Sequence, residues 1–385
     1  MAYLPSFIDS FKQAKDQAKK RKAQYENSQL LLEAFSDEFE LTRQKPNLTV
    51  DTEQISVLAN KIAWIDEIKK DVVVIHGPRR SGKSTAALIA VNQLQAEYGP
   101  KYAQYRLYDP EFWAWWEDVD LSNTKFLVLD SVFPIWRDLK QESLENLQYR
   151  AKKHKLVVLV IISTLEYYWL RQGAPDTNLM VFDKPGEFHP FGISKTREIV
   201  EIIQSRIRWS QQPSPFSPEA IQAIATLSFG LPGLAIWLVR NILNGIPSLG
   251  VGIEVPRLEL PDLEHWISQL RYIPALKLLA RFSRFEEFVN AEGIVNLLGT
   301  PMRPFSESQT TILDEMLLLN HETGIIQRSE LQARTGIKES SLTYSCQGLV
   351  QEKLVKYMKI GREVNYQLNS PVKEALELIF AEKHT

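Results

Sequence analysis

The strongest chemical signal in the sequence is a glycine-rich loop. It satisfies the pattern G-x-x-x-x-G-K-[ST], in which backbone N–H groups wrap phosphates, the lysine reaches the terminal phosphates and the last hydroxyl holds Mg²⁺. The glycines allow backbone conformations and close approaches that a side chain would block. The pattern predicts a site for ATP, with Mg²⁺ on the Ser84 hydroxyl, formed by Gly77, Pro78, Arg79, Arg80, Ser81, Gly82, Lys83, Ser84 and Thr85.

The elements around this loop are the ones that such a site needs. The apolar stretch Asp71–Ile75 predicts a strand before the loop, and an alanine-rich helix begins near Lys83. The N-terminus of that helix adds a favourable dipole for an anion. An ordinary glycine turn is the alternative, and the flanking strand and helix disfavour it.

The second half of the site is expected to be an acidic group at the end of a neighbouring strand. Phe126–Leu129 is an apolar run, and Asp130 follows it directly. We expect Asp130 to orient Mg²⁺ through water and to help place the terminal phosphates, so Lys83 and Asp130 are the leading candidates for catalytic residues. A strand that simply ends in a turn is the alternative interpretation.

Two hydroxyl residues end the next predicted strand, Leu156–Ile162. Ser163 and Thr164 occupy a place where a polar side chain can sense the terminal phosphate, and they complete the set of candidate catalytic residues. Two small polar residues that only end a strand are an equally good interpretation.

The last part of the chain has the pattern of a small DNA-binding unit. Its order of three helices and a hairpin, with Gly336 at the turn between the second and third helices, is typical of a winged helix-turn-helix. The expected helices are Thr310–Leu319, Arg328–Thr335 and Lys338–Leu354, and the expected hairpin strands are Val355–Ile360 and Glu363–Leu368.

The third of these helices has two different faces. Leu342, Cys346, Leu349 and Val350 recur at helical spacing and are expected in the core. The opposite face and the basic hairpin carry residue types that donate to phosphates and base edges. The predicted DNA contacts are Lys338, Ser340, Ser341, Thr343, Tyr344, Gln347, Lys356, Lys359 and Arg362. A protein-binding role is the alternative, because neighbouring acids offset these bases and a fold alone does not settle function.

The rest of the chain supplies the scaffold. Apolar strands that alternate with a helical segment, Asp138–His154, predict a parallel sheet covered on both faces. The expected strands beside Asp71–Ile75 are Tyr102–Tyr108, Phe126–Leu129 and Leu156–Ile162. After Pro213 the patterns are helical only, at Pro218–Thr226, Leu231–Asn244, Leu263–Leu270 and Pro274–Phe282.

The predicted fold class is therefore α/β, with a P-loop NTPase parallel-sheet core, an all-helical lid and a final winged helix-turn-helix domain. The expected boundaries are 1–50 for an N-terminal helical extension, 51–212 for the P-loop core, 213–305 for the helical lid and linker, and 306–385 for the winged helix.

Composition limits the partners that the whole molecule can attract. Its 45 basic and 47 acidic side chains nearly cancel, so any nucleic-acid surface must be local. A single cysteine, Cys346, excludes an internal disulfide framework, and a zinc cluster is not expected. No stretch approaches the roughly 18 apolar residues that span a bilayer, so we expect a cytoplasmic protein without a membrane partner.

Two local features each allow two interpretations. The basic run at residues 19–22 lies in a predicted helix, Ser6–Ala34, and is either a solvated or docking face or an arm that contacts phosphates. The cluster of Trp113, Trp115 and Trp116 is either a hydrophobic insertion packed on the sheet or a partner-binding patch.

Several phrases together resemble one group of ATPases. The stretches HGPRRSGKST, VIIST, FHPFGISKTREIVEIIQSRI and SFGLPGLAIWLV, with Asp130, occur in an order similar to the AAA+/STAND group, especially archaeal-type and origin-initiator-like ATPases with a C-terminal winged helix. The resemblance covers roughly Val72–Asn244 and, in general form, the last 80 residues. It implies that the turn Gly230-Leu231-Pro232 packs near the nucleotide, with Pro232 as a further nucleotide-binding residue.

The sequence departs from that group at two points. Ser131 stands where many AAA+ members carry a glutamate that polarises the attacking water, so the chain is expected to be a slow ATPase whose bound ATP acts as a conformational clamp. Candidates for a substitute base are Glu166, after the following strand, and Asp109 or Glu111, after the second strand. The Gly230–Ala235 turn also lacks the arginine often found there, although Arg240 follows on the same helix.

In ATPases that assemble, an arginine of one protomer stabilises charge in its neighbour's site. Arg171, Arg206 and Arg208 are the candidates, and a surface salt bridge is the favoured interpretation for each one.

The leading functional hypothesis is an ATP-binding switch that presents a DNA-binding winged helix, with double-stranded DNA and a second copy of the chain or another protein as partners. One alternative is a STAND-type signalling or defence ATPase that works by nucleotide-regulated protein assembly. Another is a mobile-element ATPase that bridges DNA to a partner protein.

Overall fold

The computed structural model describes residues 7–36, 50, 52–68, 72–107, 111–130, 149–163, 167, 188–246, 257–269, 273–282, 303–319, 325–370 and 372–373. The chain forms two compact units. One joins Met1–Val50 to Lys195–Leu270, and the other joins Asp51–Ser194 to Arg271–Thr385.

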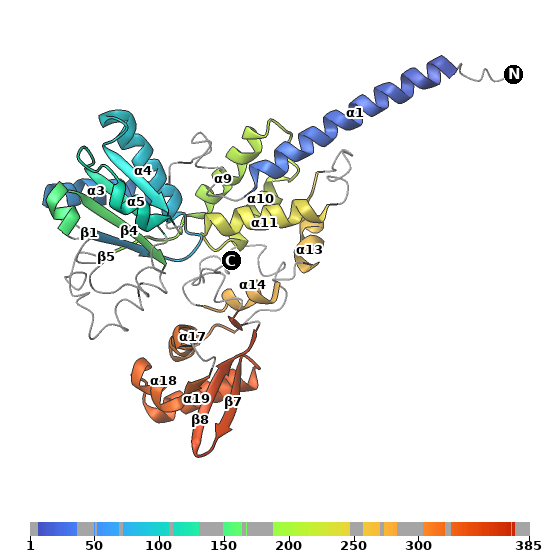
Figure 1. Cartoon of the computed structure of the whole chain (residues 1–385). Coiled ribbons are helices and arrows are strands. Elements are labelled where there is room, and N and C mark those ends of the chain that lie inside the picture. The colour runs from blue at the N-terminus through green and yellow to red at the C-terminus, as the bar shows by residue number, and fades with distance from the viewer. Residues whose placement is uncertain are drawn as a thin grey trace. The chain divides into compact units, whose positions relative to one another are not determined.

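A parallel β-sheet forms the centre of the P-loop region (Figure 1). Its strand order is β2-β3-β4-β1-β5, and every pairing within it is parallel. The strands are β1 (Val72–Gly77), β2 (Ala103–Leu107), β3 (Phe126–Asp130), β4 (Val157–Ser163) and β5 (Phe188–Pro190). The predicted α/β class with a parallel-sheet core is confirmed.

Apolar side chains cover both faces of this sheet. Helices α3 (Glu53–Ile68) and α4 (Lys83–Tyr98) pack on one face, and α5 (Phe112–Asp118) with the helical residues 149–154 packs on the other. Every residue of β4 is buried. Because each fully buried aliphatic side chain contributes roughly 1.5–3 kcal/mol, the central strands hold the core together. Burial on two sides also explains why these strands are continuously apolar.

The tryptophan cluster belongs to this core. Trp116 is almost fully buried against sheet residues such as Leu127 and Leu129, and Trp115 packs beside it. The guanidinium of Arg150 lies over the Trp116 ring, 4.6 Å from its centroid, and donates to the Trp116 carbonyl. The interpretation as a hydrophobic insertion on the sheet therefore holds for Trp115 and Trp116, while the Trp113 side chain lies outside the described residues.

The other compact unit is helical. It contains α1 (Phe7–Ala34), α9 (Thr196–Trp209), α10 (Pro218–Leu227), α11 (Pro232–Gly245) and α13 (Leu260–Gln269). Local sequence sets where α10 and α11 begin: Ser217 caps α10 by accepting from the backbone N–H of Ala220 at 3.1 Å, and a proline opens each helix.

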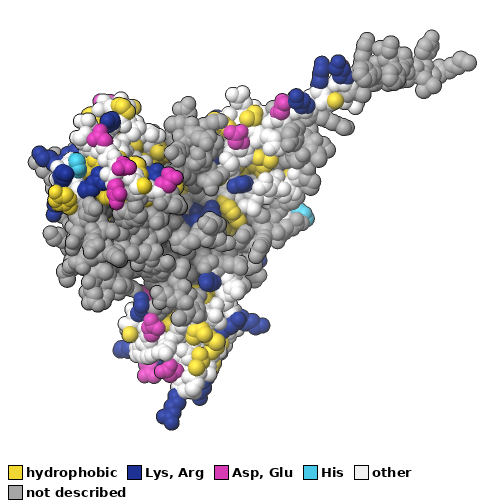
Figure 2. Space-filling model, in the orientation of Figure 1, with side chains coloured by type: hydrophobic (Ala, Val, Ile, Leu, Met, Phe, Trp, Pro, Cys, Tyr) yellow, Lys and Arg dark blue, Asp and Glu magenta, His cyan; other side chains and the backbone are white. Residues whose placement is uncertain are grey.

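Helix α1 is attached to this unit at its C-terminal end. Leu31 and Ala34 are buried there, and the guanidinium of Arg206 on α9 donates to the Ala34 carbonyl at 2.6 Å. Residues 15–20 are all exposed, so this part of α1 has no packing partner in the described portion of the chain. Basic side chains stand along it in Figure 2.

The C-terminal elements form a smaller arrangement of helices and strands. In chain order they are α17 (Glu307–Leu319), β6 (Ile326–Gln327), α18 (Arg328–Thr335), α19 (Glu339–Gln351), β7 (Val355–Ile360) and β8 (Glu363–Leu368). The strands pair antiparallel in the order β6-β8-β7.

Glycines in the left-handed region make the two tight turns of these elements. Gly336, with φ of 65°, ends α18, and Gly361, with φ of 64°, turns the β7–β8 hairpin. Leu342, Cys346 and Leu349 of α19 are buried as predicted, whereas Val350 is half-buried.

The linker before these elements is anchored to them. Helix α14 (Ile273–Leu279) is followed by Arg281, which stacks over the Phe305 ring and pairs with Glu352 at 2.5 Å. Across the described segments, no helix combines the length and apolar character needed to cross a membrane.

Candidate functional site

The glycine-rich loop connects β1 to α4 at the carboxyl edge of the sheet. Arg80 and Gly82 both adopt positive φ, at 63° and 91°, which curls the backbone between the strand and the helix. Where right-handed and left-handed backbone conformations alternate, successive N–H groups point into one concavity that suits an anion. The loop therefore has the backbone shape that the sequence pattern predicts.

Lys83 lies inside this curl. Its side chain is buried at 8% exposure, and Nζ donates to the carbonyls of Gly77 at 3.0 Å and Pro78 at 2.8 Å. These contacts keep a buried ammonium solvated by the loop itself. Because a lysine ammonium sits on a rotatable stem, it can exchange a carbonyl for a phosphate oxygen without moving the backbone.

Ser81 gives the loop an unused donor. Its side chain is 2% exposed, and Oγ makes no hydrogen bond with any described residue. A buried hydroxyl without a partner costs about 1–3 kcal/mol, so such a group is stabilised when a ligand supplies the acceptor. A phosphate oxygen is an acceptor of this kind. The loop residues therefore fit the phosphates of a nucleotide.

The remaining loop residues are less enclosed. Pro78, Arg79, Arg80 and Gly82 are half-buried, and so are Ser84 and Thr85 in the first turn of α4. The Ser84 hydroxyl thus lies at the start of the helix, directly after Lys83. There the helix dipole and the N–H groups of the loop favour a negatively charged ligand.

Strand register places the candidate acid near this loop. Asp130 is level with Ile161 of β4, which is level with Ile75 of β1, and Ser163 is level with Gly77. Side chains level across neighbouring strands point to the same face. Asp130 and Ser163 therefore share the face that α4 covers, at the carboxyl edge where open parallel sheets bind ligands.

Both of these polar side chains are buried, and Asp130 has a defined partner. Asp130 is 3% exposed and Ser163 is 6% exposed. The hydroxyl of Tyr105 on β2 donates to Asp130 Oδ2. Tyr105 is level with Val128 and so reaches diagonally across the same face to the end of β3. Tyr105 was not predicted, because only the strand register brings it to the carboxylate.

Two further residues near the loop could not be found from the sequence pattern. His76, the residue before Gly77, stacks on Tyr167 with ring centroids 3.8 Å apart. Gln54 on α3 binds the chain after β5, where its Oε1 accepts from the Gly192 N–H at 2.9 Å. Their partners lie far along the chain, so no local spacing signals either contact.

No family model matches this chain, and no curated protein matches it. Among solved structures, the chain is similar to the Orc1 protein of Aeropyrum pernix in complex with DNA, with 12% identity and a TM-score of 0.46 over 88% of this chain and 95% of that chain.

Two further solved structures complete this comparison. Cdc6p from Pyrobaculum aerophilum has 13% identity and a TM-score of 0.41, with 89% of this chain and 96% of that chain covered. A single-residue variant of RuvB from Thermotoga maritima has 14% identity and a TM-score of 0.40, with 84% and 93% covered.

Several predicted residues belong to other elements than the loop, and others fall beyond the described segments. Ser131, Thr164, Asp109, Glu166 and Arg171 are outside the described residues. Glu111 is exposed at the start of α5. Pro232 is a buried first residue of α11 in the helical unit, and Arg240 is exposed on the same helix.

The two described candidates for an inter-protomer arginine differ from each other. Arg208 forms an exposed ion pair with Glu201, as the surface interpretation predicts. That interpretation is wrong for Arg206, which is 2% exposed and binds the last carbonyl of α1. A guanidinium buried against a helix C-terminus is held by carbonyl groups and by the helix dipole, so Arg206 has a structural role in this unit.

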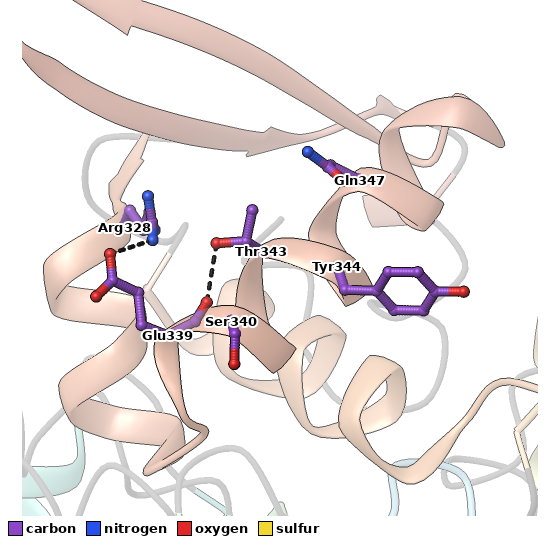
Figure 3. A pocket seen from close by; sticks show the side chains of 6 residues that line it. All are labelled: Arg328, Glu339, Ser340, Thr343, Tyr344 and Gln347. Atoms are coloured by element: carbon purple, nitrogen blue, oxygen red, sulfur yellow. Dashed lines mark hydrogen bonds and ion pairs between the residues drawn. The ribbon is translucent and has the colours of Figure 1, made fainter.

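The C-terminal elements carry an open cleft along one face of α19. We call it the α19 cleft. It has a volume of about 650 Å³ and is lined by Arg328, Glu339, Ser340, Thr343, Tyr344 and Gln347 (Figure 3). Four of the predicted DNA contacts are therefore brought together there, while Lys338 and Ser341 are exposed without lining the cleft.

The lining residues differ in how free they are. Tyr344 projects from α19 with 80% of its side chain exposed. The Thr343 hydroxyl donates back to the Glu339 carbonyl at 2.8 Å. Arg328, at the start of α18, pairs with Glu339 at 2.5 Å between Nη2 and Oε1. The sequence pattern did not predict Arg328, because Arg328 lies on α18 and the predicted DNA-binding face lies on α19.

The three predicted basic residues of the hairpin are all exposed. Lys356 and Lys359 are three positions apart on β7, so strand alternation places them on opposite faces of the hairpin. Arg362 follows the turn glycine at the tip. A DNA backbone that runs along one face could therefore meet Lys356 or Lys359, together with Arg362, and not all three as one flat patch.

Proposed function

We propose that this chain binds ATP with Mg²⁺ at the β1–α4 loop. The observation that carries the proposal is the curled loop that holds Lys83 and leaves the buried Ser81 hydroxyl without an acceptor. In this proposal Lys83 turns from the loop carbonyls to the terminal phosphates, and the Ser81 hydroxyl and loop N–H groups bind the others. Ser84 and Asp130 would hold Mg²⁺, which neutralises the phosphate charge.

Slow hydrolysis follows from the same residues. Asp130 is held by the Tyr105 hydroxyl and is followed in sequence by Ser131, which is not a base. Ser163 on the neighbouring strand, with Thr164 after it, would sense the terminal phosphate. Bound ATP then acts mainly as a switch, because the bound state persists long enough to change the conformation of the chain.

For the C-terminal elements we propose a DNA-binding winged helix. In it α18, the Gly336 turn and α19 form the helix-turn-helix, and the β7–β8 hairpin is the wing. The support is the α19 cleft, whose exposed hydroxyl, amide and tyrosine groups match the donors that contact phosphates and base edges. Duplex DNA is the proposed partner, and the division at residues 50, 212 and 305 is the proposed domain organisation.

The test is a titration of the purified protein with a fluorescent duplex at two salt concentrations, without nucleotide, with ADP, or with a non-hydrolysable ATP analogue. We expect salt-sensitive binding that depends on the nucleotide. Lys83→Ala should abolish productive ATP binding, and Lys356→Glu with Arg362→Glu should abolish DNA binding. ATP affinity that survives Lys83→Ala would contradict the nucleotide site.

A matched control separates the wing from bulk charge. Lys152→Glu with Lys153→Glu makes the same change in net charge at exposed lysines of the sheet-covering helix 149–154. We expect this variant to bind DNA like the wild type. Equal losses in both double variants would mean that total charge, and not the wing, governs binding.

Nucleotide-driven protein assembly remains the second candidate, and exposed apolar side chains favour it. Tyr344, Tyr357 and Ile360 are 80%, 53% and 55% exposed, and tyrosines are enriched at protein interfaces. Light scattering with and without ATP, in the absence of DNA, distinguishes the two candidates. Assembly driven by ATP alone, together with no binding to any duplex, would select this second function.

A further inference from the structure

The α19 cleft contains an ion pair that DNA binding through this face does not require. Arg328 comes from α18 and is only 27% exposed, whereas Glu339 stands in the first turn of α19 and is 69% exposed. The pair lies among the side chains proposed to meet DNA (Figure 3). An acid in that position repels phosphates, so its presence calls for an explanation.

The geometry shows which partner is fixed and which can leave. Arg328 is partly enclosed, and its charge acts on the buried Cys346 and Tyr366 in the core behind the cleft. Among the described residues, the Glu339 carboxylate contacts only the guanidinium of Arg328. A long exposed side chain rotates away readily, so opening this pair moves Glu339 and leaves Arg328 in place.

The guanidinium keeps capacity for a second anion. Its single described bond uses Nη2, and an arginine carries five N–H donors in a planar fork that matches two oxygens of a phosphate. The Ser340 hydroxyl and the Gln347 amide line the same cleft and are further donors for the DNA strand that enters it. The cleft therefore holds the donors of a phosphate site. The Glu339 carboxylate already occupies its guanidinium, that of Arg328.

We propose that Arg328 is a binding site for a backbone phosphate of duplex DNA, and that Glu339 occupies this site in the free protein as a built-in competitor. The proposal rests on the proposed DNA binding through α19. Binding then exchanges an intramolecular carboxylate for a phosphate, so Glu339 lowers affinity for every duplex by the same factor. Exposed ion pairs are worth little, which sets this factor at roughly twofold to fivefold.

The decisive variant is Glu339→Gln in the full chain, titrated with a short fluorescein-labelled duplex of mixed sequence. It removes the charge and keeps the side-chain shape, so DNA should bind roughly two to five times more tightly. Arg328→Gln should bind more weakly, and the slope of log K against log salt should become shallower by about 0.9 because one phosphate contact is lost. In the Arg328→Gln background, Glu339→Gln should gain less.

Glu330→Gln is the matched control, because Glu330 pairs with Arg334 on α18 and does not line the cleft. It removes the same charge and should leave DNA affinity unchanged. An equal gain in this control overturns the proposal, since it would show a general charge effect. Weaker DNA binding by Glu339→Gln, with an unchanged unfolding temperature, also overturns it and makes Glu339 a direct DNA contact.

The same experiment separates this inference from the proposed function. A wild-type chain that binds duplex normally, with affinity unaffected by Glu339→Gln, rejects the competitor alone. A wild-type chain and variants that bind no duplex reject DNA binding and, with it, the phosphate site.

Discussion

At the scale of single residues, Gly77 shows that a motif position can be constrained by packing as well as by its ligand. A Cβ at Gly77 would lie 2.4 Å from the backbone oxygen of Phe191, next to β5. Backbone atoms cannot move aside as the end of a side chain can. Gly77→Ala should therefore destabilise the P-loop core by about 1–3 kcal/mol and weaken ATP binding, as measured by thermal unfolding and nucleotide titration.

Gly348→Ala is the control for that change. Gly348 lies in α19, and its added Cβ would approach only the Nε2 atom of Gln309 on α17, at 3.2 Å. That atom is the end of a flexible side chain. We expect a neutral effect or a gain of up to about 1 kcal/mol, because alanine is the better helix former. Similar losses for both variants would mean that the close approach to Phe191 does not decide the effect at Gly77.

Tyr105 supports a second prediction at this scale. Its hydroxyl donates to Asp130, the carboxylate proposed to act on Mg²⁺. Groups that orient a metal site from one contact away typically contribute 10- to 100-fold in metal affinity. Tyr105→Phe should thus raise the Mg²⁺ concentration needed for ATP binding by at least about tenfold, without changing the fold.

The control for Tyr105 is Tyr98→Phe, since Tyr98 lies on α4 with 61% of its side chain exposed. Magnesium titrations of ATP binding should give wild-type values for this variant. An unchanged Mg²⁺ requirement in Tyr105→Phe would show that its hydroxyl only stabilises the buried Asp130.

The candidate site could be predicted in part because some of its residues are neighbours in sequence. The loop from Gly77 to Ser84 is contiguous, so spacing alone identified it. Asp130 followed from an apolar strand with an acid at its end. Tyr105 and Arg328 act through contacts between elements, at Asp130 and Glu339, and no sequence spacing encodes a strand register or a helix crossing.

At the scale of elements, clear local signals gave accurate boundaries. The predicted limits of α18, β7 and β8 agree with the structure, because Gly336 and Gly361 mark the turns. The short strands β5 and β6 were not predicted, since two or three residues cannot show an alternating pattern. Their strand geometry depends on pairing with β1 and β8.

Helix α19 carries the single cysteine, which can report on the packing of the C-terminal elements. Burial raises the pKa of the Cys346 thiol from 9.0 to about 11, and burial likewise raises the pKa of the neighbouring Tyr366 to about 12. At pH 8 the folded thiol is about a thousandth ionised, against about a tenth when unfolded.

Iodoacetamide should therefore alkylate native Cys346 at pH 8 at least about 100 times more slowly than the urea-unfolded chain. The sign of the pH effect follows from the raised pKa: both states are protonated below pH 9, so stability is full there. Between pH 9 and 11 the unfolded thiol loses its proton first, and stability falls. Equal alkylation rates for native and unfolded protein at pH 8 would contradict a packed α19.

At the scale of the whole molecule, the main question is whether the nucleotide site and the α19 cleft are energetically coupled. Binding sites on one chain can be independent, and the two proposals would then be two separate functions. A switch requires a coupling free energy, which by linkage is the same in both directions. The net charge of −2 gives no general attraction for DNA, so any effect of ATP on DNA affinity would report this coupling.

If ATP is the switch, a saturating non-hydrolysable analogue should change DNA affinity by a factor within about 5- to 150-fold, and saturating duplex should change the affinity for the analogue by the same factor. Two fluorescence titrations, each at constant salt, measure both sides of this cycle. Lys83→Ala should keep the DNA affinity of the nucleotide-free protein and lose its response to the analogue. Equal DNA affinities with and without the analogue, in a wild-type chain that binds both ligands, would leave two independent sites and exclude a switch.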